Sequence, residues 1–444
     1  MTALVKSFLG RLPTSTVRFS FIVVPVIIAL SKLLGLVREG LLTKFFGLGP
    51  GLDLFILFTT LPNYAMGYVL GPFSVAFYAS LAMPGNAAWA LLRRLFPWLF
   101  YGGLIGGLLA FVAALIIEPR MDMIGLSVGA YAAIAATCAA TIPLAVLIGA
   151  AVCLLHANKG HTTAVLLTVV QPWGFVLLLL SLDALFEGGI FGPIGLSYTL
   201  SFLLALAVAY WCVDRSDSQM ESTPENQTAA IKSFRGYLGL ATVETTGFFA
   251  NQLLTMFFAG LSGVGGIAAN GLAVRVMLTP LTLMVTPLSP ILQNLYRRSD
   301  EMRRRWIFAL AYISILLLIF SSMIVIVYFG DEVIRLFFQH GAFNAEDTAR
   351  VVALLIPYCV YAMFIASNQL CAAVAFVSGN GKFYTFTMLT NYGVSNLLKI
   401  PMLAQFGLEG VIWAAAAAEG AAALANLWRQ LFRRADMAHS GEAQ

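Results

Sequence analysis

Long runs of apolar residues alternate with short polar segments from residue 19 almost to the end of the chain. About 20 apolar residues in a helix are enough to cross the hydrocarbon core of a bilayer. Prolines fall inside several runs, which membrane helices tolerate where neighbouring helices or a cavity support the backbone. The pattern predicts twelve membrane-spanning helices, at roughly 19–37, 52–80, 95–117, 128–155, 161–182, 190–213, 236–260, 266–294, 306–329, 349–378, 384–403 and 407–432.

Composition supports a membrane protein and excludes a soluble one. Hydrophobic residues make up 60% of the 444 residues and charged residues only 11%, whereas soluble domains carry about 25% charged residues. The net charge of +5 comes mostly from short basic loops, so it indicates no nucleic-acid partner. The predicted fold class is an all-α polytopic membrane protein.

The distribution of basic residues predicts the orientation. Most of the 26 Lys and Arg residues fall in the segments that lie on one side if the helices alternate in direction. Loops rich in Lys and Arg stay in the cytoplasm. Both termini are therefore predicted to be cytoplasmic.

The longest strongly polar stretch divides the chain into two sets of six predicted helices. Its Ser, Thr, Gln and Glu content is typical of a flexible linker, and two such halves around a central cavity are common in transporters. We predict a cytoplasmic amphipathic N-terminus at 1–18, an N-lobe at 19–213, a cytoplasmic linker at 214–235, a C-lobe at 236–433 and a cytoplasmic tail at 434–444.

Several cations lie inside the apolar runs. Lys32 and Arg275 are well within predicted helices, where a charge costs on the order of a few kcal/mol, so we expect both to face a cavity. Arg38 and Lys399 lie near helix ends, where a long side chain can extend to the membrane surface. For these two, that interpretation and a role in binding are both open.

The acids inside the runs are fewer. Glu39 is expected to pair with Arg38 or Lys32. Glu244, in the string LATVETTGFF, is expected to pair with Arg275 or Lys32, or to carry a proton or a cation. The excess of cations over acids favours an anionic substrate.

Three segments of the sequence resemble one transporter family. The string SKLLGLVREGLLTKFFGLGPGLDLFILFTTLPN (31–63) resembles the opening of the MurJ (MviN) lipid II flippases, within the multidrug/oligosaccharidyl-lipid/polysaccharide exporter superfamily. LFFQHGAFNAEDTARV (336–351) looks like an outer loop of that family, and NLLKIPMLAQFGLEGVIWA (396–414) resembles its eleventh and twelfth helices. The matching residues of the opening are Ser31, Gly35, Arg38, Gly47, Gly49, Asp53, Leu61, Pro62 and Asn63.

The resemblance implies a two-lobed flippase that moves lipid-linked precursors by alternating access. A cationic cavity would bind the diphosphate and sugar headgroup, with Lys32, Arg38 and Arg275 at the positions of three cavity arginines. Lys at position 32 keeps the charge but lacks the bidentate fork that suits phosphate. The predicted substrate-binding residues are Lys32, Arg38, Arg275, Ser31, Asp53 and Asn63. The predicted coupling or structural residues are Glu244, Asn251, Lys399 and Glu39.

The chain also departs from the family pattern. Val274 and Leu278 stand where members carry acids, and Thr255 stands at the sodium-site Asp of some members. The segment 64–74 lacks the family's arginine pair and acid, and the family's two additional C-terminal helices fall outside the twelve. We expect a divergent, shorter member that moves lipid II or another lipid-linked glycan, such as an exopolysaccharide repeat unit.

Other functional classes have less support. A cation-coupled drug antiporter needs buried acids, of which Glu244 is the candidate. A membrane enzyme would draw on His340, Glu346 and Asp347, but His340-Gly-Ala-Phe is more typical of a helix end and a tight turn. A scaffold for glycan synthases is also compatible with the sequence.

We therefore predict a transporter in the bacterial inner membrane, with no catalytic or metal-binding residue and no cofactor. A coupling cation or the membrane potential would supply the energy. The predicted partners are the lipid-linked glycan, membrane lipids and, as candidates, enzymes of glycan synthesis.

Overall fold

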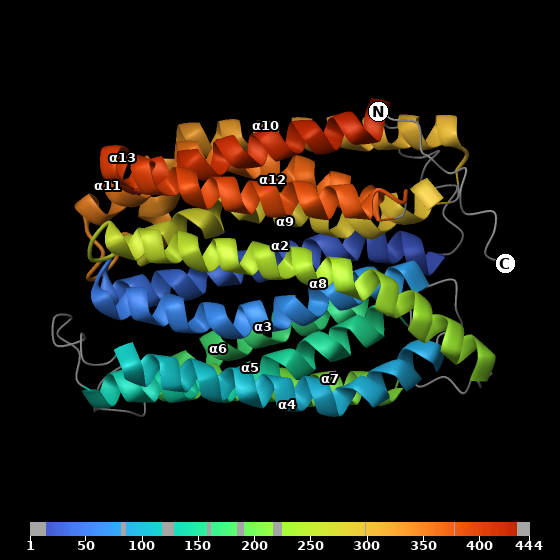
Figure 1. Cartoon of the computed structure of the whole chain (residues 1–444). Helices are drawn as coiled ribbons and strands as arrows, with labels where there is room; N and C mark the ends of the chain where they lie inside the picture. The colour runs from blue at the N-terminus through green and yellow to red at the C-terminus, as the bar shows by residue number, and fades with distance from the viewer. Residues whose placement is uncertain are drawn as a thin grey trace. The chain divides into compact units, whose positions relative to one another are not determined.

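The secondary structure of the described residues is α-helical, without a strand (Figure 1). The computed structural model describes residues 15–80, 86–117, 128–157, 161–183, 191–215, 224–297, 299–376 and 378–432. The helices are α2 (Ser15–Phe46), α3 (Pro50–Ser80), α4 (Asn86–Ile117), α5 (Val128–Ala157), α6 (His161–Asp183), α7 (Phe191–Arg215), α8 (Pro224–Leu261), α9 (Gly266–Arg297), α10 (Glu301–Phe338), α11 (Ala345–Ala353), α12 (Leu355–Ala375) and α13 (Gly381–Phe432). The predicted fold class, an all-α polytopic membrane protein, is confirmed.

Each predicted helix coincides with an observed one, but several observed helices are longer. Helix α2 continues to Phe46 beyond the predicted 37, α4 begins at Asn86 before 95, and α10 continues to Phe338 beyond 329. The run predicted as a single helix over 349–378 is divided at Leu354 into the short α11 and the long α12. Asn344 starts α11 one turn before the apolar run, because its side chain accepts hydrogen bonds from the first backbone N–H groups. Pro357 then lies in the first turn of α12, where its missing N–H costs little.

The last two predicted helices are both present in α13, which is bent between them. Gly407 has φ 60° and ψ −146°, a backbone conformation that is essentially restricted to glycine. The kink separates the N-terminal part of α13, which ends before Gly407, from the C-terminal part that follows it. This position agrees with the predicted break between residues 403 and 407.

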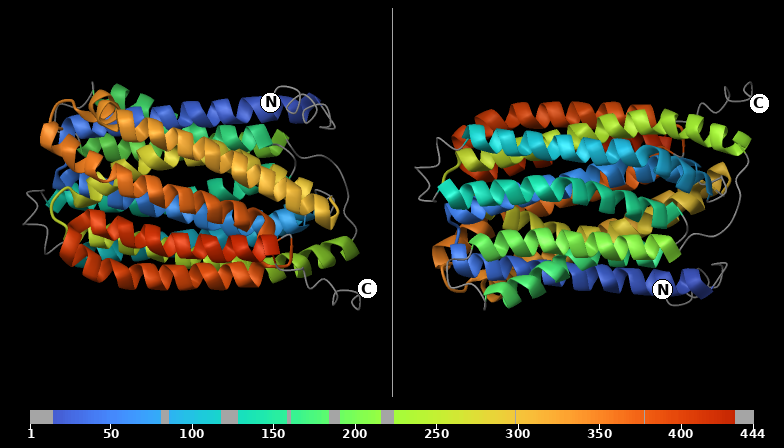
Figure 2. Two further views of the ribbon diagram at one scale, coloured as in Figure 1. Left: turned by 90° about the horizontal axis from the view of Figure 1, so that it is seen from above. Right: turned by 90° about the horizontal axis from the view of Figure 1, so that it is seen from below.

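The chain forms two compact units. Unit 1 comprises residues 1–42 and 50–238, and unit 2 comprises 43–49 and 239–444. In unit 1, α5 packs against α3, α4, α6 and α7; in unit 2, α12 packs against α9, α10, α11 and α13. The two views of Figure 2 show the long helices of each unit running side by side. Small residues allow close packing, since a Cβ on Gly107 of α4 would lie only 2.5 Å from the carbonyl oxygen of Ala139 on α5.

The segment predicted as a flexible linker differs in its second half. Helix α8 begins at Pro224, so residues 224–235 are helical, and proline is well suited to the first helical position. Residues 216–223 lie outside the described residues, as do residues 1–14 of the predicted N-terminal segment and the whole of the predicted tail (434–444).

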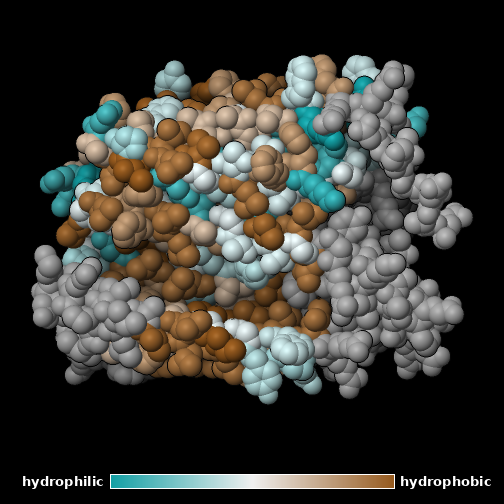
Figure 3. Space-filling model, in the orientation of Figure 1, coloured by the Kyte–Doolittle hydropathy of each residue, from teal (hydrophilic) through white to brown (hydrophobic). Residues whose placement is uncertain are grey.

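Apolar side chains cover much of the outer surface. On the face shown in Figure 3, brown apolar residues occupy most of the coloured area. Helix α10, for example, exposes Leu310, Leu317, Val325 and Phe329. Such a row of exposed apolar side chains fits contact with lipid. Among the described residues, six helices are long and apolar enough to cross a membrane, judged by length and composition.

Candidate functional site

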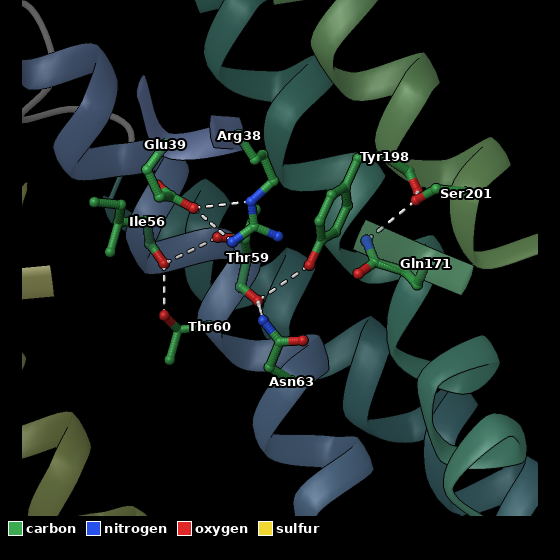
Figure 4. A network of polar contacts seen from close by, with 9 residues as sticks. All are labelled: Arg38, Glu39, Ile56, Thr59, Thr60, Asn63, Gln171, Tyr198 and Ser201. Carbon is green, nitrogen blue, oxygen red and sulfur yellow. Dashed lines mark hydrogen bonds and ion pairs between the residues drawn. The ribbon is translucent and has the colours of Figure 1, made fainter. Parts of the chain in front are cut away.

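Arg38 and Glu39 form an ion pair in unit 1. The guanidinium Nε and Nη2 of Arg38 donate to Oε1 of Glu39 at 2.8 and 2.5 Å, as Figure 4 shows. The Glu39 side chain is fully buried and that of Arg38 is 12% exposed. One of the two pairings predicted for Glu39 is therefore present. The carboxylate fixes the orientation of the guanidinium plane.

Aromatic and amide groups surround this pair. The guanidinium carbon of Arg38 lies 6.0 Å from the centre of the Phe175 ring on α6, within the range of a cation–π contact. The hydroxyl of Tyr198 on α7 donates to the backbone oxygen of Thr59 on α3 (3.1 Å). The side-chain amide of Asn63 donates to the same oxygen (2.9 Å). Figure 4 shows Tyr198, Thr59 and Asn63 in the same region of unit 1 as the ion pair.

The other predicted substrate-binding residues are half-buried. Ser31 and Lys32 lie on α2, and Asp53 lies in the first turn of α3, all in unit 1. Arg275 lies on α9 in unit 2, and its backbone oxygen accepts from the hydroxyl of Thr279 (2.6 Å). Unit 1 thus brings Arg38, Glu39 and Asn63 together. A cavity shared with Arg275 stays a prediction.

Lys399 does not extend to the membrane surface, although its sequence position allowed this. Its side chain is fully buried in unit 2. The ammonium Nζ donates to Oδ1 of Asn251 (2.8 Å), Oγ1 of Thr255 (2.8 Å) and Oδ1 of Asn396 (3.0 Å). Two of the predicted coupling or structural residues, Asn251 and Lys399, are therefore in direct contact. We call Lys399, Asn251, Thr255 and Asn396 the Lys399 site.

Glu244 has a different partner from those predicted. Its Oε1 accepts a hydrogen bond from the hydroxyl of Tyr392 at 2.9 Å, instead of an ion pair with Arg275 or Lys32. A tyrosine hydroxyl can satisfy a carboxylate without bringing a second charge into the membrane region. The contact joins α8 to the N-terminal part of α13.

Glu419 is a buried acid that the sequence analysis missed. It is 5% exposed, and its two carboxylate oxygens accept from the side-chain amides of Asn368 (2.9 Å) and Asn391 (2.6 Å). The amide of Asn426 donates in turn to Oδ1 of Asn368 (2.9 Å). The sequence contains a signal for this residue, because Glu419 is a lone acid in the apolar string AAAAAEGAAAL. Ionisable residues inside membrane helices usually have a functional or structural role.

The acids considered for a catalytic site cap a helix instead. The carboxylate of Asp347 accepts from the backbone N–H of Asn344, and the side chain of Asn344 accepts from the N–H of Asp347, which together form a capping box. Glu346 lies in the same first turn of α11. His340 follows the end of α10 at Phe338 and precedes the turn at Gly341, as its motif indicated. Within the described ranges, no group of three His, Cys, Asp or Glu side chains is placed to hold a metal ion.

Comparison with known families identifies the relationship of the chain. The model of the lipid II flippase MurJ family matches residues 42–443. The chain belongs to this family. No curated protein sequence is significantly similar to it.

Solved structures of transporters share the fold. A lipid II flippase MurJ in an inward closed conformation is 19% identical, with a TM-score of 0.71 over 92% of this chain and 87% of that one. A MATE transporter in complex with MaL6 is 16% identical, with a TM-score of 0.65 over 92% and 94%. A transporter of the MOP superfamily from Pyrococcus furiosus is 16% identical, with a TM-score of 0.61 over 92% and 93%. Family and fold are thus those of membrane transporters.

Proposed function

We propose that the protein is a flippase for an undecaprenyl-diphosphate-linked glycan precursor, either lipid II or a related lipid-linked oligosaccharide. It would move this lipid from the cytoplasmic to the outer face of the bacterial inner membrane by alternating access, with both termini in the cytoplasm. The observation that carries the proposal is the family match over residues 42–443. On this proposal the protein is a transporter and catalyses no bond change.

The charges of the chain suit a diphosphate ligand. Positive side chains replace part of the water around a diphosphate, and arginine does so with a planar fork of N–H donors. Glu39 engages Nε and Nη2 of Arg38, so Nη1 takes no part in that ion pair. Arg38 is thereby held rigidly, which lowers the entropy lost when an anion binds. Lys32 and Arg275 would add two further positive charges.

The proposal is tested with Lys32→Ala, Arg38→Ala and Arg275→Ala in cells that depend on this protein for the transport step. Each variant is expected to lose complementation. The amounts of Lys32→Ala and Arg275→Ala in the membrane should stay normal, and Arg38→Ala is compared at a matched amount because it also leaves Glu39 without its partner. Arg335→Ala is the matched control, because the Arg335 side chain is 62% exposed and pairs with Asp331 on the surface of α10. Wild-type growth with all three variants would rule out the proposed site.

A related substrate, an exopolysaccharide repeat unit, is favoured by specific departures from the family pattern. Val274 and Leu278 on α9 replace acids that flank the third cavity arginine in the resemblance described above. Fewer acids near Arg275 would suit a headgroup with more negative charge. Expression in cells that lack their lipid II flippase separates the two substrates: rescue supports lipid II, and failure with normal expression supports the other glycan.

The energy source and the partners follow from the same proposal. No cofactor is needed, because transport requires binding and a change of access without a chemical step. The membrane potential or a coupling cation would supply the driving force. Glycan synthesis enzymes are the expected protein partners, since they make or consume the lipid-linked substrate.

A further inference from the structure

The Lys399 site has the geometry of a small cation site. Three oxygen atoms from two helices lie within 2.8–3.0 Å of a single point, the Nζ atom of Lys399. Asn251 and Thr255 are one turn apart on α8 and so lie on the same face of the helix. Asn396 lies three residues before Lys399 on α13. An ammonium group has three N–H donors, and each of them meets one of the three oxygens.

The oxygens of this site are neutral. They belong to two amide groups and one hydroxyl, and among the described residues no carboxylate lies within ion-pair distance of Nζ. The hydroxyl of Thr255 donates its own hydrogen to the backbone oxygen of Asn251 (2.8 Å), so its lone pairs face the ammonium. Neutral oxygens that replace a hydration shell are the ligands that proteins use for monovalent cations.

No carboxylate of the described residues forms an ion pair with Lys399. The buried carboxylate of Glu419, in the same unit, is hydrogen-bonded to the amides of Asn368 and Asn391. The immediate stabilisation of the ammonium therefore comes from the dipoles of Asn251, Thr255 and Asn396. A buried charge without such dipoles would be strongly unfavourable.

We infer that the Lys399 site is a monovalent-cation site whose occupant is the ammonium group of Lys399 itself. The tethered ammonium takes the position of a metal ion, so the wild-type protein binds no Na⁺ or K⁺ there. Removing the side chain leaves three oxygen ligands around one vacant point, which a monovalent ion can enter. The inference is independent of the proposed substrate, because ion binding is measured on the purified protein without any lipid-linked glycan.

The test is thermal unfolding of purified wild type and Lys399→Ala in NaCl, KCl or N-methyl-D-glucamine chloride at one ionic strength. The wild-type midpoint is expected to be the same in all three salts. The variant is expected to unfold earlier in N-methyl-D-glucamine chloride and to show a saturable upward shift of several degrees with Na⁺ or K⁺, because an ion that binds only the folded state stabilises it. Binding of radioactive ²²Na⁺ should likewise appear in the variant and be absent in the wild type.

Three further variants make the result specific. Lys382→Ala removes an exposed lysine from the same helix and should behave like the wild type. Asn251→Leu in the Lys399→Ala background removes one oxygen and should abolish the response to ions. Lys399→Gln, which is neutral and keeps a polar side chain, should respond to ions if the alanine variant folds poorly.

Three results would overturn the inference. One is stabilisation of the wild type by Na⁺ or K⁺ to the same extent as the variant. Another is a folded, monodisperse Lys399→Ala or Lys399→Gln whose midpoint ignores the salt, which would make Lys399 a cross-link between α8 and α13 and no more. The third is failure of both variants to fold in every salt, because the inference predicts rescue by the ion.

Discussion

The backbone N–H of Ala342 donates to the backbone oxygen of Lys44 at 2.9 Å. This bond joins the last turn of α2 to the turn that follows α10. In the turn between α2 and α3, the N–H of Leu48 adds a longer contact (3.4 Å) to the carboxylate of Asp347. Residues 43–49 consequently belong to unit 2, although the rest of α2 and all of α3 belong to unit 1. Asp347 thus has two roles, since it also caps α11.

Replacing Gly47 should weaken this connection. Gly47 has φ 55°, and a Cβ at this position would lie 2.7 Å from the backbone oxygen of Ala342. A side chain in the left-handed region costs roughly 1–2 kcal/mol, and the close contact adds to that cost. Gly47→Ala is therefore expected to lower the thermal unfolding midpoint of the purified protein.

Gly393→Ala is the control for this prediction. Gly393 lies in α13, and an added Cβ would meet no atom within 4 Å. Alanine is favoured over glycine in a helix by roughly 0.5–1 kcal/mol, so the midpoint should stay the same or rise. Equal midpoints for Gly47→Ala and wild type would show that the turn contributes little to stability.

The ion pair between Arg38 and Glu39 predicts a strong coupling in a double-mutant cycle. Removing one member of a buried pair leaves the other charge without its partner and costs about 3–5 kcal/mol. Arg38→Ala and Glu39→Ala should each destabilise unit 1, and the double variant should lose much less than the sum of the two. Steric trapping or denaturant unfolding in micelles measures these free energies. Additive losses would mean that the two side chains act independently.

Glu419 predicts a graded loss of stability. Glu419→Ala leaves the amide of Asn391 without its acceptor and removes one of two acceptors from the amide of Asn368, which keeps the backbone oxygen of residue 419. An unsatisfied buried donor costs about 1–3 kcal/mol. Glu419→Gln keeps one acceptor oxygen and should lose less. The expected order of thermal midpoints is wild type, then the glutamine variant, then the alanine variant. A glutamine variant as unstable as the alanine variant would indicate that the negative charge matters more than the hydrogen bonds.

Glu244 distinguishes the flippase from a cation-coupled antiporter. An antiporter needs a carboxylate that binds and releases a proton or a cation, whereas a flippase can use Glu244 as an acceptor for Tyr392 alone. Glu244→Gln keeps that acceptor and should retain transport and complementation, while Arg275→Ala loses them. Loss of transport in Glu244→Gln with normal folding would favour ion coupling through this residue.

Sequence patterns predicted the helices well, because each apolar run is long enough to be unambiguous. The sequence pattern also placed the break before Gly407, because Gln405, Glu409 and two glycines interrupt the apolar run there. It joined α11 to α12, because a nine-residue helix that depends on a capping box adds little to a hydropathy pattern. Local capping decides such a boundary, and a window of apolar residues does not report it.

The site was predicted less completely than the fold. Lys399 and Asn251 were both selected, but nothing in one sequence says that two residues 148 positions apart are in contact. Glu244 was expected to pair with Arg275 or Lys32, or to carry a proton or a cation, whereas its partner in the structure is the hydroxyl of Tyr392. A neutral donor of this kind leaves no trace in a charge pattern. Glu419 could have been found by the same rule that selected Glu244.

The chain passes between the two units at 42/43, 49/50 and 238/239. The first and third crossings fall inside the continuous helices α2 and α8, and the second falls between Gly49 and Pro50, where α3 begins. At two of these three points the polypeptide therefore passes from one unit to the other within helical backbone, so those two connections are continuous helices and not loops.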